Sequence, residues 1–388
     1  MTAVVAIILA SCFWALLIHT IGSISLVDGN VVLNSAETRT SNHQQWLDYI
    51  KATSDMMPWN TSLPAKFTQP TPQKKEVVIS DHGLHGEKTL VVDQNDRGCF
   101  SSIQAAVDSV RNWSESRTVI LIRKGIYREK VLIPKEKERI TFLGEPGSTV
   151  IQWNSTASDL GSDGLPLRTY HSATVAVNAR YFVAKYITFK NTAGAAWPGQ
   201  RGRQAVALRI SADYAAFYSC LFLGYQDTLY DHRGRHYFKN CYIVGAVDFI
   251  FGNGRSLYQN CRLYAWPMGT TGSLTAQKRN DTSLNTGFAF VSCVVGGSGS
   301  VYLGRAWGNN SRVVFALTWM DRIIAPGGWN DWGIPARERS VYYALYKCSG
   351  PGSIVNRKVG WSTELTLQEA WPFLSIGFIN GMDWLEEI

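Results

Sequence analysis

The segment Gln204–Gly254 reads QAVALRISADYAAFYSCLFLGYQDTLYDHRGRHYFKNCYIVGAVDFIFGNG, and a repeat within it decides the fold. Phe217 lies three residues before Cys220, and Phe238 lies three residues before Cys241, so the pattern recurs with a shift of 21 (241 − 220). Short runs rich in β-branched and aromatic residues surround each copy and are typical of strands. Repeats of this length predict a solenoid such as a parallel β-helix.

The repeat extends beyond this segment in both directions. Downstream, the aromatic-to-cysteine spacing recurs at Tyr258/Cys261 and Phe290/Cys293, with shifts of 20 (261 − 241) and 32 (293 − 261). Upstream, NARYFVAKYITFKNT from Asn178 resembles SADYAAFYSCLFLGY from Ser211, a shift of 33 (211 − 178). Residues at equivalent positions of successive solenoid coils stack on one another. We therefore expect an all-β domain built from stacked coils.

Two aspartates follow the same repeat as the cysteines. Asp227 and Asp248 differ by the same shift of 21 (248 − 227), so they should lie on neighbouring coils, one above the other, with Gln204 and Gln226 nearby. Both acids have apolar neighbours, and burial of a carboxylate is costly unless the group is paired or neutralised. One charged and one protonated acid could divide catalytic roles. The alternative is that both aspartates are ordinary turn residues.

The composition indicates a large folded domain with an acidic partner. The 388 residues are 45% hydrophobic and 18% charged, with a net charge of +8 and a pI near 9.1. An excess of positive charge favours association with a polyanionic glycan, a nucleic acid or a membrane surface. The basic residues are scattered and form no stripe, so we expect no nucleic-acid partner.

The N-terminal region differs in amino-acid composition from the rest of the chain. The apolar run Val4–Ile18 predicts a signal peptide over residues 1–25, with an uncleaved anchor as the alternative. Residues 26–87 are polar and proline-containing, as in an arm or linker, and residues 88–388 form the predicted β-helix domain. Within that domain, Phe100–Val110 has the apolar spacing of a short helix that would cap the N-terminal end of the stack.

The cysteines and sequons suggest an oxidising compartment. We expect disulfide bonds Cys220–Cys241 and Cys261–Cys293 between stacked coils, with Cys99 and Cys348 free. No C-x-x-C pair is present, and the His pairs have no accompanying acidic or Cys set, so we expect no metal site. N-glycosylation sequons, which predict a glycoprotein, occur at Asn60, Asn112, Asn154, Asn280 and Asn309.

From about Lys88 to Leu385, the chain resembles the plant-type pectin methylesterases. The matching motifs are KGIYREKV at Lys124–Val131, YHSATV at Tyr170–Val175, QAVALRI at Gln204–Ile210, GYQDTLY at Gly224–Tyr230, VDFIFGNG at Val247–Gly254, LGRAWG at Leu303–Gly308 and Gly328–Trp329. The resemblance implies a right-handed parallel β-helix. It also implies a secreted, monomeric enzyme of the cell wall that needs no cofactor and acts on methyl-esterified homogalacturonan. A proteinaceous pectinesterase inhibitor is a further implied partner.

The resemblance also assigns roles to particular residues. Asp248 would be the nucleophile, Asp227 the general acid and then the general base, and Arg305 the partner that keeps Asp248 ionised. Gln204 and Gln226 would donate hydrogen bonds to the oxyanion. The implied substrate-binding residues are Tyr170, Gln204, Tyr230, Phe251, Arg305, Trp307 and Trp329. The family usually has proline at the position of Ala306, so we expect a looser backbone beside Arg305.

The residues alone leave other functions open. Two carboxylates on a β-helix would also suit a glycoside hydrolase of acidic polysaccharide, although that reaction needs no oxyanion-binding amides. A polysaccharide lyase would want a basic proton abstractor and often calcium, and no acidic cluster suggests a calcium site. A catalytically weak pectin-binding wall protein is the alternative without enzymatic function.

Overall fold

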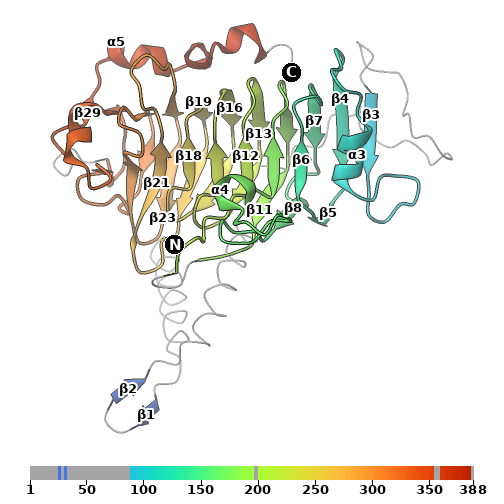
Figure 1. Ribbon diagram of the computed structural model, residues 1–388. Helices are drawn as coiled ribbons and strands as arrows, with labels where there is room; N and C mark the ends of the chain where they lie inside the picture. Colours follow the sequence, from blue (N-terminus) through green and yellow to red (C-terminus); the bar gives the residue numbers. More distant parts are fainter. Residues whose placement is uncertain (1–24, 28–29, 33–87, 196–199, 354–358, 386–388) are drawn as a thin grey trace, which may run out of the picture. The chain divides into compact units, whose positions relative to one another are not determined.

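The computed structural model describes residues 25–27, 30–32, 88–195, 200–353 and 359–385 (Figure 1). The chain divides into two compact units, residues 1–68 and 69–388. In the first unit, β1 (Ser25–Val27) pairs antiparallel with β2 (Asn30–Val32). The rest of the predicted signal peptide and most of the predicted arm lie outside the described residues. None of the helices in the described residues is both long and apolar enough to span a membrane.

The second unit is built from three parallel sheets that run side by side along its length (Figure 1). Sheet 1 contains β6 (Val131–Ile133), β9 (Val175–Val177), β12 (Leu208–Ile210), β15 (Leu229–Asp231), β18 (Ile250–Gly252), β21 (Thr271–Gln277), β24 (Ser300–Arg305) and β27 (Trp329–Asn330). Sheet 2 contains β3 (Lys88–Val92), β4 (Thr118–Ile122), β7 (Ile140–Leu143), β10 (Val183–Lys185), β13 (Ala215–Tyr218), β16 (Arg235–Lys239), β19 (Arg255–Gln259), β22 (Gly287–Val291), β25 (Arg312–Ala316), β28 (Tyr342–Tyr346) and β29 (Thr363–Glu364). Sheet 3 contains β5 (Gly125–Arg128), β8 (Thr149–Trp153), β11 (Thr188–Asn191), β14 (Leu221–Leu223), β17 (Tyr242–Gly245), β20 (Arg262–Ala265), β23 (Val294–Gly297) and β26 (Trp319–Met320).

Each coil passes once through all three sheets, and each strand pairs with its counterpart in the next coil. β12, β13 and β14 form one coil, and β15, β16 and β17 form the next. The Cα partners Leu208↔Leu229 and Phe217↔Phe238 reproduce the shift of 21 in the sequence repeat. The predicted parallel β-helix is therefore confirmed, and so is the predicted coil length of 21 residues between β12 and β15.

The corner between sheets 2 and 3 has the same form in successive coils. Its first residue has a positive φ in seven of them: Tyr186, Ser219, Asn240, Asn260, Ser292, Leu317 and Lys347. This conformation is uncommon outside glycine, and Asn tolerates it best among side-chain-bearing residues. Backbone hydrogen bonds continue through the corner, for example from Asn240 N to Gln259 O at 3.0 Å. The turn therefore costs no inter-coil hydrogen bond.

The aromatic residues of the repeat form a stack inside the solenoid. The ring centroids of Phe217 and Phe238 are 4.9 Å apart, and those of Phe238 and Tyr258 are 4.4 Å apart. Phe290 and Phe315 continue the stack at spacings of 4.5 Å. These spacings match the distance of about 4.8 Å between neighbouring strands, so the side chains repeat with the backbone.

The cysteines of the repeat form a second internal column, and the predicted disulfide bonds are wrong. All the cysteines in the described residues are free. Cys99 and Cys348 are half-buried, whereas the four of the column are buried: Cys220, Cys241, Cys261 and Cys293. Stacked coils place equivalent Cβ atoms about 4.8 Å apart, whereas a disulfide bond needs about 3.8 Å. Each thiol of the column instead donates to a backbone carbonyl, and burial raises the pKa of Cys220 to about 12.

Helical segments cover apolar surface at the N-terminal end of the stack and along the outer face of sheet 2. The predicted N-terminal helix is present as α3 (Ile103–Ser109), which is capped by Ser102 and buries Ile103, Ala106 and Val107. The C-terminal segment holds α5 (Leu367–Ala370), η4 (Trp371–Phe373), η5 (Ile376–Ile379) and η6 (Gly381–Asp383), following η2 (Pro335–Arg339). Its apolar residues, including Phe378 and Trp384, pack on the outer face of sheet 2.

We expect Phe238→Ala to lower the free energy of unfolding by about 3–5 kcal/mol, because it opens a cavity in the aromatic stack. Phe238 is fully buried between Phe217 and Tyr258. Urea denaturation followed by circular dichroism measures the change. Trp371→Ala is the control because Trp371 is exposed, and it should change the free energy little. A Phe238→Ala loss below about 1 kcal/mol would contradict the packing role of the stack.

We expect the cysteine column to resist alkylation in the native protein, because its side chains are buried and burial raises the pKa of Cys220, Cys261 and Cys293. Among the six cysteines from residue 88 onward, only Cys99 and Cys348 should react with a maleimide under native conditions. After unfolding without a reductant, all six thiols from residue 88 onward should react. Peptide mass spectrometry identifies each site. Four thiols that stay unreactive after unfolding would restore the disulfide hypothesis.

Candidate active site

Asp227 and Asp248 precede equivalent strands of sheet 1. Gln226 and Val247 form a parallel bridge, and the amide of Asp227 donates to the carbonyl of Val247 at 3.1 Å. The two aspartates are therefore adjacent rungs of one column, as the sequence repeat predicts. Both have positive φ, 63° for Asp227 and 49° for Asp248. Non-glycine residues in this region concentrate at functional sites, where the surrounding structure maintains the strain.

The Asp248 carboxylate is held by groups from the next two coils. Arg305, at the end of β24, donates from Nε to Oδ1 at 2.9 Å and from Nη2 to Oδ2. Ser273, in β21, donates its hydroxyl to Oδ1 and accepts from the Asp248 amide at 2.9 Å. Burial lowers the pKa of Arg305, but the hydrogen bond and charge of Asp248 outweigh it and raise that pKa overall. This two-pronged pairing fixes the orientation of the Asp248 carboxylate.

The Asp227 carboxyl has the opposite character. Burial raises its pKa well above the ordinary range, and the charge of Asp248 raises it further, whereas Arg305 lowers it. Asp227 and Asp248 are only 8% and 6% exposed. Among the described residues, no group donates a hydrogen bond to the Asp227 carboxyl. The pair thus consists of one anchored carboxylate and one carboxylic acid that is free to donate its proton.

Two glutamines lie beside the aspartate column. Gln226 directly precedes Asp227, and its carbonyl accepts from the amide of Ala205, next to Gln204, at 3.1 Å. Both glutamine side chains are half-buried. Within the described part of the chain, neither side-chain NH₂ has an acceptor, so each could donate to a bound oxyanion. The side-chain oxygen of Gln204 is buried without a partner.

Four of the predicted aromatic residues form a continuous strip on sheet 1 and the adjoining helix α4 (Arg168–His171). Tyr230 and Phe251 stack with their centroids 4.2 Å apart, and Trp307 lies 6.1 Å from Phe251. Tyr170, in α4, contacts Tyr230 edge-on at 6.4 Å. Tyr170, Tyr230 and Trp307 are half-buried, which suits contact with the flat face of a ligand, whereas Phe251 supports them from below.

The prediction that Trp329 lines the groove is wrong. Its side chain is in the solenoid core, 2% exposed, and stacks on Tyr343 at 4.3 Å. The aromatic ring near the aspartates at this end is instead Trp332, which faces the Arg305 guanidinium at 4.3 Å. Trp329 pairs with Gly304 in the sheet, so its side chain follows the inward-facing set, while Arg305 next to Gly304 faces outward.

Ala306 does not loosen the backbone as expected. Its amide donates to the carbonyl of Asn330 at 2.9 Å, a hydrogen bond that a proline could not make. This bond fixes the chain directly after Arg305.

Sequence reasoning missed two further polar residues near the column. Ser273 follows Asp248 with a shift of 25, so a search by a constant shift of 21 passes over it. His232 accompanies the aromatic strip, with its ring 4.9 Å from Tyr230 and its Nδ1 2.9 Å from the Ser211 hydroxyl. Burial lowers the pKa of His232 to about 4, and the charges of Arg209 and Arg233 contribute, so this ring is neutral above that pH.

The described residues contain no cluster of His, Cys, Asp and Glu that could hold a metal ion. His236, for example, is buried and contacts Asp231 through Nδ1 and the carbonyl of Ala212 through Nε2. A fixed carboxylate, a protonated acid and free amide donors in one column can attack a carbonyl, stabilise the resulting oxyanion and protonate a leaving group.

Comparison with known proteins agrees with this geometry. The pectinesterase family model matches residues 89–382. Pectinesterase QRT1 of Arabidopsis thaliana is 48% identical, over 77% of this chain and 79% of its own length. Probable pectinesterase 8 of the same plant is 45% identical, over 76% of each chain.

Solved structures extend the likeness to the fold. A pectin methylesterase from carrot superposes with a TM-score of 0.71 at 38% identity, over 77% of this chain and 95% of its own. A pectin methylesterase in complex with a hexasaccharide has a TM-score of 0.64 at 27% identity, over 75% and 96%. The predicted right-handed parallel β-helix is thereby confirmed. The motifs, the coil architecture and these likenesses lead to one conclusion: the chain belongs to the pectinesterase family.

Proposed function

We propose that this protein hydrolyses the methyl esters of galacturonate units in pectin, releasing methanol and de-esterified pectin. The observation that carries the proposal is the aspartate column, in which Arg305 pairs with the Asp248 carboxylate through two hydrogen bonds while burial raises the pKa of Asp227 well above its ordinary range. Family membership supports the substrate, and the hexasaccharide bound by a solved relative supports a carbohydrate groove.

In the first half of the reaction, a carboxylate oxygen of Asp248 attacks the carbonyl carbon of the ester. The carbonyl π electrons move to oxygen, and the resulting oxyanion accepts hydrogen bonds from the side-chain amides of Gln204 and Gln226. When the tetrahedral intermediate collapses, the bond to the methoxy oxygen breaks and Asp227 gives that oxygen its proton. Methanol leaves, and the sugar remains as an acyl group on Asp248.

In the second half, the roles reverse. Asp227, now a carboxylate, takes a proton from water while the water oxygen attacks the acyl carbon. Collapse of the second oxyanion breaks the bond to Asp248, frees the galacturonate carboxyl and restores the proton on Asp227. The aromatic strip of Tyr170, Tyr230 and Trp307 binds neighbouring sugar rings.

The setting of this activity is also a proposal. A signal peptide over residues 1–25 would export the protein to the cell wall, where it acts as a monomer and meets a proteinaceous inhibitor. Four sequon asparagines lie in the described part of the chain, and all four are exposed, which supports a glycoprotein: Asn112, Asn154, Asn280 and Asn309.

We expect Asp248→Asn to lower methanol release from methylated pectin by at least about 1000-fold, because it removes the nucleophile. Circular dichroism should show an unchanged fold. Asp383→Asn is the control, since Asp383 is exposed and remote in sequence from the site. Normal methanol release by folded Asp248→Asn would refute the nucleophile. Chain shortening in place of methanol release would indicate a glycoside hydrolase.

We expect Asp227→Asn to lose about 100-fold or more of the activity and yet to be more stable than wild type at neutral pH. Because the folded pKa of Asp227 exceeds its unfolded value, stability from this group is full below the unfolded pKa and is lost as pH rises through the folded pKa. Asparagine mimics the protonated form and avoids that loss. The gain should therefore vanish near about pH 3, below the unfolded pKa, as urea denaturation at several pH values can test. An equal gain at all pH values would argue against a raised pKa.

A further inference from the structure

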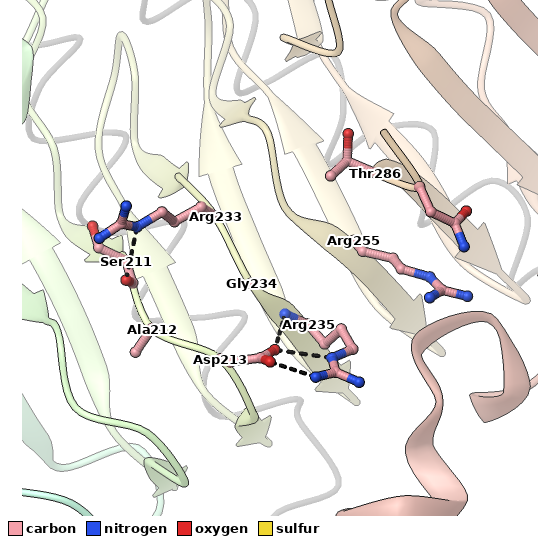
Figure 2. A pocket seen from close by; sticks show the side chains of 9 residues that line it. Ser211, Ala212, Asp213, Arg233, Gly234, Arg235, Arg255 and Thr286 are labelled. Carbon is pink, nitrogen blue, oxygen red and sulfur yellow. Dashed lines mark hydrogen bonds and ion pairs between the residues drawn. The ribbon is translucent and has the colours of Figure 1, made fainter. Parts of the chain in front are cut away.

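A cavity of about 430 Å³ lies beyond the aromatic strip, where the strands of sheet 1 turn into those of sheet 2 (Figure 2). We call it the arginine pocket. The lining residues that matter here are Asp213, Arg233, Arg235, Arg255, Asn285 and Thr286. Asp213, Arg233, Asn285 and Thr286 lie in the turns that follow β12, β15 and β21, whereas Arg235 and Arg255 begin β16 and β19, so successive coils each contribute to the wall.

The arginine pocket carries uncompensated positive charge. Its one carboxylate, Asp213, is occupied by Arg235, whose Nη2 lies 2.5 Å from Oδ2 and whose Nε lies 3.0 Å from Oδ1 (Figure 2). In the described part of the chain, neither Arg233 nor Arg255 has an ion pair. The Nε of Arg255 is buried without a hydrogen-bond acceptor. Two cations thus remain after the single anion is neutralised.

Further positive charge lies behind the wall. Arg312 donates to the Thr286 carbonyl at 2.8 Å and to Oδ1 of Asn285 at 2.9 Å, which fixes both lining residues. Burial, followed by the charges of Arg279 and Arg255, lowers the pKa of Arg312 to about 10. Such mutual repulsion would be relieved by an anion in the cavity.

The spacing of the guanidinium groups suits a ligand with several carboxylates. Arg235 and Arg255 are directly paired in the sheet, so their backbones are about 4.8 Å apart. Like charges opposite one another in a sheet destabilise it, and Asp213 compensates only Arg235. Guanidinium groups bind carboxylates in a two-pronged geometry, which lysine does not match.

The arginine pocket is connected to the proposed catalytic groove. β15 begins two residues after Asp227 and ends directly before the turn that carries Arg233. The Ser211 hydroxyl, at the pocket, contacts His232, and the His232 ring contacts Tyr230 of the aromatic strip. A chain lying along the strip would therefore reach the arginine pocket without leaving the protein surface.

We propose that the arginine pocket binds the carboxylates of a galacturonan segment that has already been de-esterified. The inference rests on the proposed function, because ester hydrolysis is what converts neutral methyl esters into carboxylates. The pocket discriminates between the two, since a methyl ester carries no charge to pair with Arg233 and Arg255. It anchors the protein on the product side of the boundary between esterified and de-esterified pectin.

The test is a calorimetric titration of the full chain with a short de-esterified oligogalacturonate. Arg233→Gln with Arg255→Gln should raise the Kd at least about tenfold, while methanol release from a short methyl ester stays unchanged. When Arg255 is replaced by Lys in place of Gln, only part of the affinity should return, because Arg255→Lys keeps the positive charge but cannot form the two parallel hydrogen bonds of a guanidinium group. The control, Arg97→Gln with Arg322→Gln, removes the same charge from exposed sites and should leave the Kd unchanged.

Three results would overturn the inference. The first is an unchanged Kd in the folded Arg233→Gln, Arg255→Gln variant, and the second is an equal loss in the control. The third is inorganic phosphate binding as tightly as the oligogalacturonate at equal ionic strength, which would indicate an adventitious ion only. A protein that releases no methanol but binds oligogalacturonate through these arginines would refute the proposed function alone. Normal methanol release, together with a Kd for oligogalacturonate that does not change when Arg233 and Arg255 are substituted, would refute the arginine pocket alone.

Discussion

The in-register hydrogen bonding of one coil to the next is the constraint on which the rest of the structure depends. Because parallel strands repeat at about 4.8 Å, every side chain is stacked on its counterpart from the preceding coil. Inside, this repetition yields the aromatic stack of Phe217, Phe238 and Tyr258. Outside, it brings Asp227 and Asp248 together, although neither would tolerate the other as an isolated charge.

The two aspartates can lie side by side because their carboxyl groups have different hydrogen-bond partners. Asp248 receives a guanidinium and a hydroxyl from the two following coils, whereas Asp227 receives neither. Burial therefore raises the pKa of Asp227 well above its ordinary range, whereas Asp248 has a cation as its partner. The difference between them comes from the residues that the neighbouring coils place beside each carboxyl group.

Much of this arrangement could be predicted where the coil length is constant. One shift relates Cys220 to Cys241 and Asp227 to Asp248, so the column followed from arithmetic. The constant shift did not predict the role of Ser273, because the coil from Asp248 to Ser273 has 25 residues in place of 21. The prediction failed for Trp329 because a motif does not give the direction of a side chain, and the pairing of Trp329 with Gly304 in the sheet turns this ring into the core.

The disulfide prediction failed for a different reason. Proximity of cysteines on neighbouring coils is real, but a regular stack holds their Cβ atoms too far apart for a bond. No motif pointed to the arginine pocket either, since Arg255 is 20 residues (255 − 235) from Arg235 in the sequence and lies beside it only through the fold.

The corner between sheets 2 and 3 keeps one backbone form while the coils differ in length. From β10 onward, variation in coil length is consequently found in the connections on either side of sheet 1, which border the proposed groove. The loops around the catalytic column can therefore change in length or sequence without disturbing the paired strands that align Asp227 with Asp248. A solenoid of this kind separates the part that must stay constant from the part that adapts to different polymers.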